Sequence, residues 1–64
     1  MTFAQFVASI HDHSDPDSVT DFWIASWFDD NGVIITFQNK DNTFTDVGIH
    51  VADVNDWVTE WMTA

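Results

Sequence analysis

Histidine and aspartate alternate near the start of the chain, in the segment His11-Asp12-His13-Ser14-Asp15-Pro16-Asp17. Both residue types are ligands of Zn²⁺ and similar ions, so this segment is the first candidate for a metal site. On a helix, however, residues two positions apart point to different sides, which separates His11 from His13. The third histidine, His50, is expected on a strand. We therefore interpret His11 and His13 as solvated side chains that stabilise a helix C-terminus, and we expect no metal and no cofactor.

Other patterns with catalytic or ion-binding chemistry are weak. Asp29-Asp30-Asn31-Gly32 contains residues typical of a calcium loop, but alignment on the glycine puts Gln38 at the last ligand position, where a glutamate is expected. The two glycines, Gly32 and Gly48, do not form a glycine-rich phosphate loop. None of the serines stands in a recognisable nucleophile motif. We expect that this protein is not an enzyme.

Carboxylates are the dominant chemical group. The 64 residues include 11 Asp and Glu against a single Lys or Arg, and the formal net charge is −10. A net charge of about 2–8 in magnitude is enough for solubility, so this excess needs another explanation. Binding to nucleic acid or to an anionic membrane needs several cations and is excluded by this composition. The charge instead favours a basic protein partner.

Length and composition indicate one folded domain, residues 1–64. The chain has no Cys, which excludes disulfides and thiolate metal sites. Aromatic residues make up 16% of it, whereas acidic disordered chains are poor in them. No apolar run approaches the roughly 20 residues of a membrane span. The first 13 residues lack the basic start and long apolar stretch of a signal peptide, so we expect the protein in the cytoplasm.

The N-terminal segment has the spacing of an amphipathic helix. Thr2 and Gln5 form a T-x-x-Q capping box. We expect the helix to end near His13, because Pro16 moves the residue before it out of the helical conformation. Residues 14–18 are then a loop. The apolar side chains fall at i, i+3, i+4 and i+7, namely Phe3, Phe6, Val7 and Ile10.

A second helix is predicted at the C-terminal end of the sequence. Asp53 is a suitable N-cap for it. The apolar positions that follow are spaced i, i+3, i+4, i+7 and i+8, namely Val54, Trp57, Val58, Trp61 and Met62.

The middle of the chain has the composition and alternation of strands, over residues 21–28, 33–38 and 43–51. Asn31-Gly32 indicates a hairpin between the first two, and residues 39–42 form a second turn. The fold class is therefore α+β, a three-stranded antiparallel meander flanked by an N-terminal and a C-terminal helix (α-β-β-β-α) on one face. Residues 21–28 also fit a helical stripe, so a helix there is an open alternative.

A meander places alternate turns at opposite ends of its sheet, so the topology predicts where the carboxylates gather. The first end receives Asp29, Asp30, Asp53 and Asp56, and Glu60 extends the last two into a stripe on the second helix, opposite its apolar face. The opposite end, roughly 23 Å away, receives a second group. Its members are Asp12, Asp15, Asp17, Asp21 and Asp41.

Bulky apolar residues lie on both predicted faces of residues 21–28. Phe22, Ile24 and Phe28 share one face, and Trp23 and Trp27 share the other. If both helices cover one face of the sheet, the other exposes an apolar patch that includes Ile34 and Phe44, and such patches mark interfaces. A helix at 21–28, or a strongly twisted sheet, would instead bury these side chains.

In size, acidity, β-rich core and lack of an enzymatic motif, the chain resembles small phage-encoded DNA-mimic inhibitors of the anti-CRISPR kind. The resemblance is at the level of class and covers the whole chain without a diagnostic motif. It is carried by acidic residues, namely Asp12, Asp15, Asp17, Asp21, Asp29, Asp30, Asp53, Asp56 and Glu60.

The resemblance implies a stoichiometric inhibitor that occupies a Lys/Arg-rich DNA-binding channel of a host defence complex. A CRISPR effector subunit that recognises the target DNA is one such partner. The carboxylates would accept hydrogen bonds from arginine, and Trp23 and Trp27 would add apolar anchors. The inhibitor is expected in the host cytoplasm as a monomer or homodimer.

Three alternatives remain open from the sequence. The first is an acidic protein that masks a basic partner, in the manner of an antitoxin or chaperone. The second is a salt-adapted domain whose charge serves only solvation. The third is a metal-binding domain that uses His11, His13 and nearby aspartates.

Overall fold

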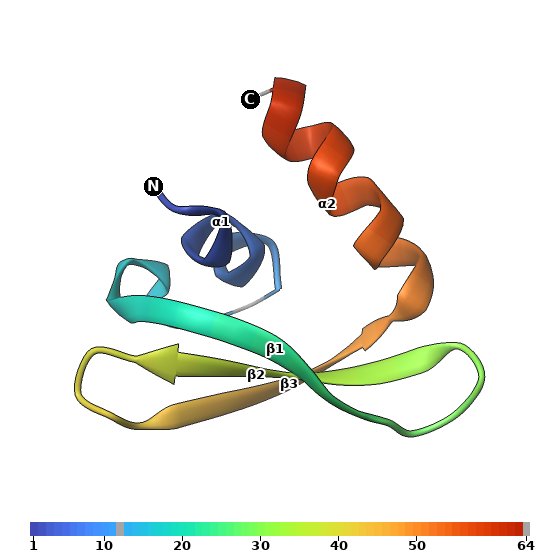
Figure 1. The fold of residues 1–64 in the computed structure, drawn as a ribbon, viewed down its shortest axis with the longest axis horizontal. Coiled ribbons are helices and arrows are strands. Elements are labelled where there is room, and N and C mark those ends of the chain that lie inside the picture. Colours follow the sequence, from blue (N-terminus) through green and yellow to red (C-terminus); the bar gives the residue numbers. More distant parts are fainter. Residues whose placement is uncertain (12, 64) are drawn as a thin grey trace.

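The structure is a computed structural model that describes residues 1–11 and 13–63. The predicted α-β-β-β-α order is confirmed, with one short 3₁₀ turn added (Figure 1). The elements are α1 (Phe3–Ile10), η1 (Pro16–Ser18), β1 (Val19–Trp27), β2 (Gly32–Asn39), β3 (Phe44–His50) and α2 (Val51–Thr63). The three strands form one antiparallel sheet in the order β1-β2-β3.

Both helices lie on the same face of the sheet, and the other face is uncovered (Figure 1). The core forms between them because β2 is the central strand and turns every second side chain toward the helices. From α2, only Trp57 is buried. Among residues 1–11 and 13–63, the buried apolar residues are Val7, Ala8, Val19, Val33, Ile35, Phe37, Ile49 and Trp57.

Helix α1 begins as predicted, but it ends three residues early. The capping box is complete, since Thr2 Oγ1 accepts from the Gln5 N–H and Gln5 Oε1 accepts from the Thr2 N–H. The chain leaves the helix at His11, whose φ of −120° and ψ of 40° are not helical. This early exit carries His13 into the interior, where it is buried against β2.

Residues 19–27 form a strand, so the helical alternative for this segment is wrong. An irregularity between Ile24 and Ser26 changes which side chains share a face. Beyond it, Trp27 pairs with the buried Val33 and lies on the core side, whereas Trp23 pairs with Thr36 on the open side. The prediction that Trp23 and Trp27 share a face is therefore wrong, because a bulge shifts the two-residue alternation by one.

The hairpin between β1 and β2 lies where Asn31-Gly32 predicts it, but with a different backbone. Gly32 already belongs to β2 and has no positive φ. Its role is steric, since a Cβ at this position would overlap the ring of Phe28. The left-handed backbone conformation occurs in the second hairpin instead, at Asn42 with a φ of 65°.

Helix α2 follows β3 without a loop, so it begins at Val51 and not after Asp53. The Val51 N–H donates to the carbonyl of Asn31 at 2.7 Å, so a backbone group of the first hairpin replaces the predicted side-chain cap. Asp53 lies in the first turn, where its charge still complements the helix dipole. Farther along, the apolar stripe leaves the sheet, and Met62 is 78% exposed.

Candidate functional site

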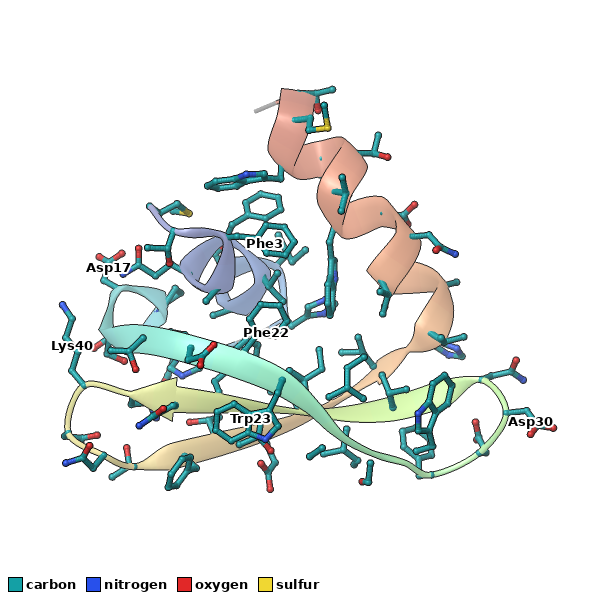
Figure 2. The ribbon with its side chains drawn as sticks, in the orientation of Figure 1. Phe3, Asp17, Phe22, Trp23, Asp30 and Lys40 are labelled. Atoms are coloured by element: carbon teal, nitrogen blue, oxygen red, sulfur yellow. The ribbon has the colours of Figure 1, made fainter. Side chains whose placement is uncertain are left out.

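Carboxylates lie at both ends of the sheet, but Asp46 lies on β3 between the ends and the acids of α2 border α1. Figure 2 shows Asp30 at the hairpin between β1 and β2, and Asp17 with Lys40 at the opposite end. Asp29 and Asp30 are both exposed. Lys40 is the only Lys or Arg in the sequence, so the end that carries Asp29 and Asp30 has neither. Its local charge is therefore the more uniformly negative of the two.

The sequence predicts that the acidic stripe of α2 lies opposite the apolar face of the helix. The structure contradicts this prediction. Asp53, Asp56 and Glu60 line a hollow of about 210 Å³ together with Ile10 and His11 of the other helix. The buried Trp57 lines the same hollow, because it is four residues after Asp53 and one turn of helix separates them. The stripe thus borders the contact between the two helices while Asp56 and Glu60 remain exposed.

His11 takes part in the packing of α2. Its Nε2 accepts a hydrogen bond of 2.7 Å from the indole N–H of Trp57, and the two rings meet edge to face with centroids 5.5 Å apart. This bond requires an unprotonated Nε2. The interpretation of His11 as a solvated side chain is wrong, because tertiary packing brings Trp57 over it.

His13 is the second histidine that the sequence suggested was solvated, and it is buried instead. The Asp15 N–H donates to His13 Nδ1 at 2.9 Å, so Nε2 carries the proton and donates to Asn39 Oδ1 at 2.9 Å. The amide of Asn39 in turn donates to Thr43 and Thr45 at 3.1 and 3.2 Å. These bonds tie the segment after α1 to the hairpin between β2 and β3.

Replacing Asn39 with alanine is expected to lower the free energy of unfolding by about 2–3 kcal/mol, because buried polar groups lose their partners. Urea denaturation followed by circular dichroism measures the change. Gln38→Ala is the matched control, since Gln38 is adjacent on β2 but faces the open side. Equal unfolding midpoints for the two variants would mean that the network adds no stability.

The second acidic end is partly neutralised by Lys40. Asp15 and Asp41 line a hollow of about 380 Å³ with this lysine. The hydroxyl and the backbone N–H of Thr43 both donate to Asp41, and these bonds lower the pKa of its carboxyl. Asp17 and Asp21 are exposed near the same end, and Asp12 lies outside the described residues.

The open face of the sheet exposes large apolar side chains, as one of the two sequence interpretations predicted, and it also carries Asp21 and Asp46. Trp23 is 41% and Phe44 is 59% exposed. Ile34 lies between the two edge strands, opposite Ser26 and Gly48. Phe44 and Asp46 are both exposed on this face, although neither is among the partner-binding residues predicted from the sequence. The alternation of residues 43–51 was the signal for them, since it places both on one face.

Within residues 1–11 and 13–63, no three metal-ligating side chains lie close enough together to hold an ion. Among the same residues, no helix has the length and apolar character needed to cross a bilayer. Comparison with protein-family models, with curated proteins and with solved structures finds no match for this chain.

Proposed function

We propose that this protein is a stoichiometric inhibitor that mimics DNA and occupies a Lys/Arg-lined DNA-binding channel of a host defence complex in the bacterial cytoplasm. One observation carries the proposal. The only Lys or Arg lies at one end of the sheet, so the carboxylates at the other end have no such cation beside them. A channel that binds phosphates attracts such carboxylates through its positive field.

The charge density supports the same function. A net charge of −10 along a longest dimension of 32 Å corresponds to one charge per about 3 Å. Duplex DNA carries one charge per about 1.7 Å of its axis, or about 3.4 Å for each strand, so the protein approaches the charge density of one strand of the duplex. Exposed carboxylates can accept charge-assisted and bidentate hydrogen bonds from the arginines that otherwise hold phosphates. A CRISPR effector subunit that recognises the motif beside the target DNA has a channel of this kind.

The test is a pull-down from a bacterial lysate with active defence systems, eluted with salt and read by mass spectrometry. We expect one DNA-binding complex to be retained and to be released by added duplex DNA. The recovered complex should then lose binding to a labelled DNA duplex at a one-to-one ratio of inhibitor, as measured by fluorescence anisotropy. Retention of one basic protein that duplex DNA does not displace would replace mimicry with the masking of a basic partner.

A further inference from the structure

Two aromatic rings and two carboxylates form a compact cluster on the open face of the sheet. In one row of the sheet Trp23 is opposite Thr36, which is opposite Asp46. In the neighbouring row Asp21 is opposite Gln38, which is opposite Phe44. Directly opposed residues of antiparallel strands share a face. We call the four outer members of these rows, Asp21, Trp23, Phe44 and Asp46, the aromatic–acidic cluster.

The two rings of the cluster contact each other across the central strand. Their centroids are 6.1 Å apart at an interplanar angle of 65°, so the edge of one ring meets the face of the other. Figure 2 shows Trp23 on the side of β1 turned away from the helices, with Phe22 on the side that faces them. Both rings of the pair remain more than one-third exposed. The cluster therefore offers aromatic surface to a partner.

One hydrogen bond orients each of the two carboxylates of the cluster. The hydroxyl of Thr36 donates to Asp46 Oδ1 at 2.7 Å, and the N–H of Phe22 donates to Asp21 Oδ1 at 2.7 Å. Each bond engages one carboxylate oxygen, and both aspartates are exposed. Their orientation is thus defined before a partner arrives.

This combination matches the chemistry of one side chain. A guanidinium is planar, stacks on an aromatic face and presents N–H groups in a fork that fits a carboxylate. The lysine ammonium is a strongly hydrated point charge and gains less from the rings. A second copy of this chain is electrostatically disfavoured on the face, because each copy carries a net charge of −10.

We propose that the aromatic–acidic cluster is an arginine-binding surface, and that an arginine-bearing protein docks on the open face of the sheet. This inference rests on the proposed function, since it identifies the face and the partner side chain that a basic DNA-binding surface would use. Charge alone does not discriminate between basic proteins, whereas an aromatic pair between two carboxylates selects arginine over lysine.

Two fluorescent peptides of equal charge, octa-arginine and octa-lysine, test the proposal without an identified partner. We expect the intact protein to bind octa-arginine about tenfold more tightly than octa-lysine in anisotropy titrations, because stacking adds to the charge term. In NMR spectra of the same protein, octa-arginine should shift the indole N–H signal of Trp23 more than that of Trp27. Equal affinities for the two peptides, or equal shifts of the two indole signals, would overturn the proposal.

Matched variants assign the preference to the cluster. Trp23→Ala and Phe44→Ala should each remove most of the arginine preference and leave octa-lysine binding unchanged. Trp27→Ala is the control, since this exposed tryptophan lies on the same strand beyond the bulge, on the other face. For the carboxylates, Asp46→Asn should weaken arginine binding selectively, whereas Asp29→Asn should weaken both peptides equally. A preference that survives both aromatic substitutions would contradict the assignment.

The outcome of the peptide titrations can be distinguished from the outcome of the pull-down. An arginine preference without a DNA-displaceable complex would retain the arginine-binding face and reject DNA mimicry. A DNA-displaceable complex whose affinity is unaffected by Trp23→Ala would retain mimicry and reject the face. The other candidate occupant of the face is a second copy of this chain. Analytical ultracentrifugation of the protein alone tests for it, because a dimer that Trp23→Ala dissociates would assign the face to a second copy.

Discussion

Substitution of Asp29, Asp30 and Asp56 by lysine is expected to abolish binding to the DNA-binding partner and to leave the domain folded. All three side chains are exposed. Each substitution changes the charge by two, so the formal net charge rises from −10 to about −4. Hydrogen bonds to charged groups contribute about 1.5–3 kcal/mol each, so the loss of three corresponds to more than about 1,000-fold in affinity. Surface plasmon resonance on the recovered complex measures this loss.

A second triple variant distinguishes a defined contact surface from bulk charge. Asp15, Asp17 and Asp41, substituted by lysine, produce the same net charge at the end that contains Lys40. We expect this variant to retain most of the affinity. If both triple variants weaken binding equally, the partner senses total charge, and the assignment of the contact to the first end is wrong. Asp29 and Asp41 each accept a hydrogen bond within their turns, and the substitutions remove these bonds. Circular dichroism therefore verifies that each variant is still folded.

Trp57→Ala is expected to cause the largest loss of stability of any single substitution. Trp57 is only 4% exposed and is the one buried residue of α2. Its ring contacts Phe22 edge to face at 5.6 Å, and its N–H donates to His11. Truncation of a buried tryptophan costs about 3–5 kcal/mol, which is comparable to the whole stability of a domain this small. Urea denaturation followed by circular dichroism should show a largely unfolded variant.

Trp57→Phe separates the ring from its hydrogen bond. Phenylalanine retains the aromatic packing against Phe22 but removes the N–H donor, so we expect a smaller loss of about 1–2 kcal/mol. Trp27→Ala is the exposure control, with 61% of the side chain already in solvent, and should change stability by less than about 1 kcal/mol. Unfolding midpoints that are equal for Trp57→Ala and Trp27→Ala would show that α2 contributes little to the fold.

The helices and strands of the fold depend on local sequence patterns, which explains why these elements could be predicted. A capping box needs only residues three positions apart, and a helical or strand stripe needs only its own spacing. The alternation in residues 43–51 likewise places Ile49 inside and Phe44 outside, as observed. The sequence also determines the main electrostatic property of the candidate site, because the net charge is −10 and only one lysine compensates the carboxylates.

The tertiary structure decided the features that depend on partners distant in sequence. The bulge after Ile24 is a shift in the register against β2, and it moves Trp27 to the core side. His13 is buried because Asn39, 26 residues later, satisfies its Nε2. The acidic stripe of α2 borders the contact between the two helices because Trp57 packs against His11, 46 residues away. The spacing of residues within one segment carries no information on such long-range pairings. Local periodicity therefore determined the helices and strands, whereas long-range hydrogen bonds and packing determined which side chains are exposed on each surface.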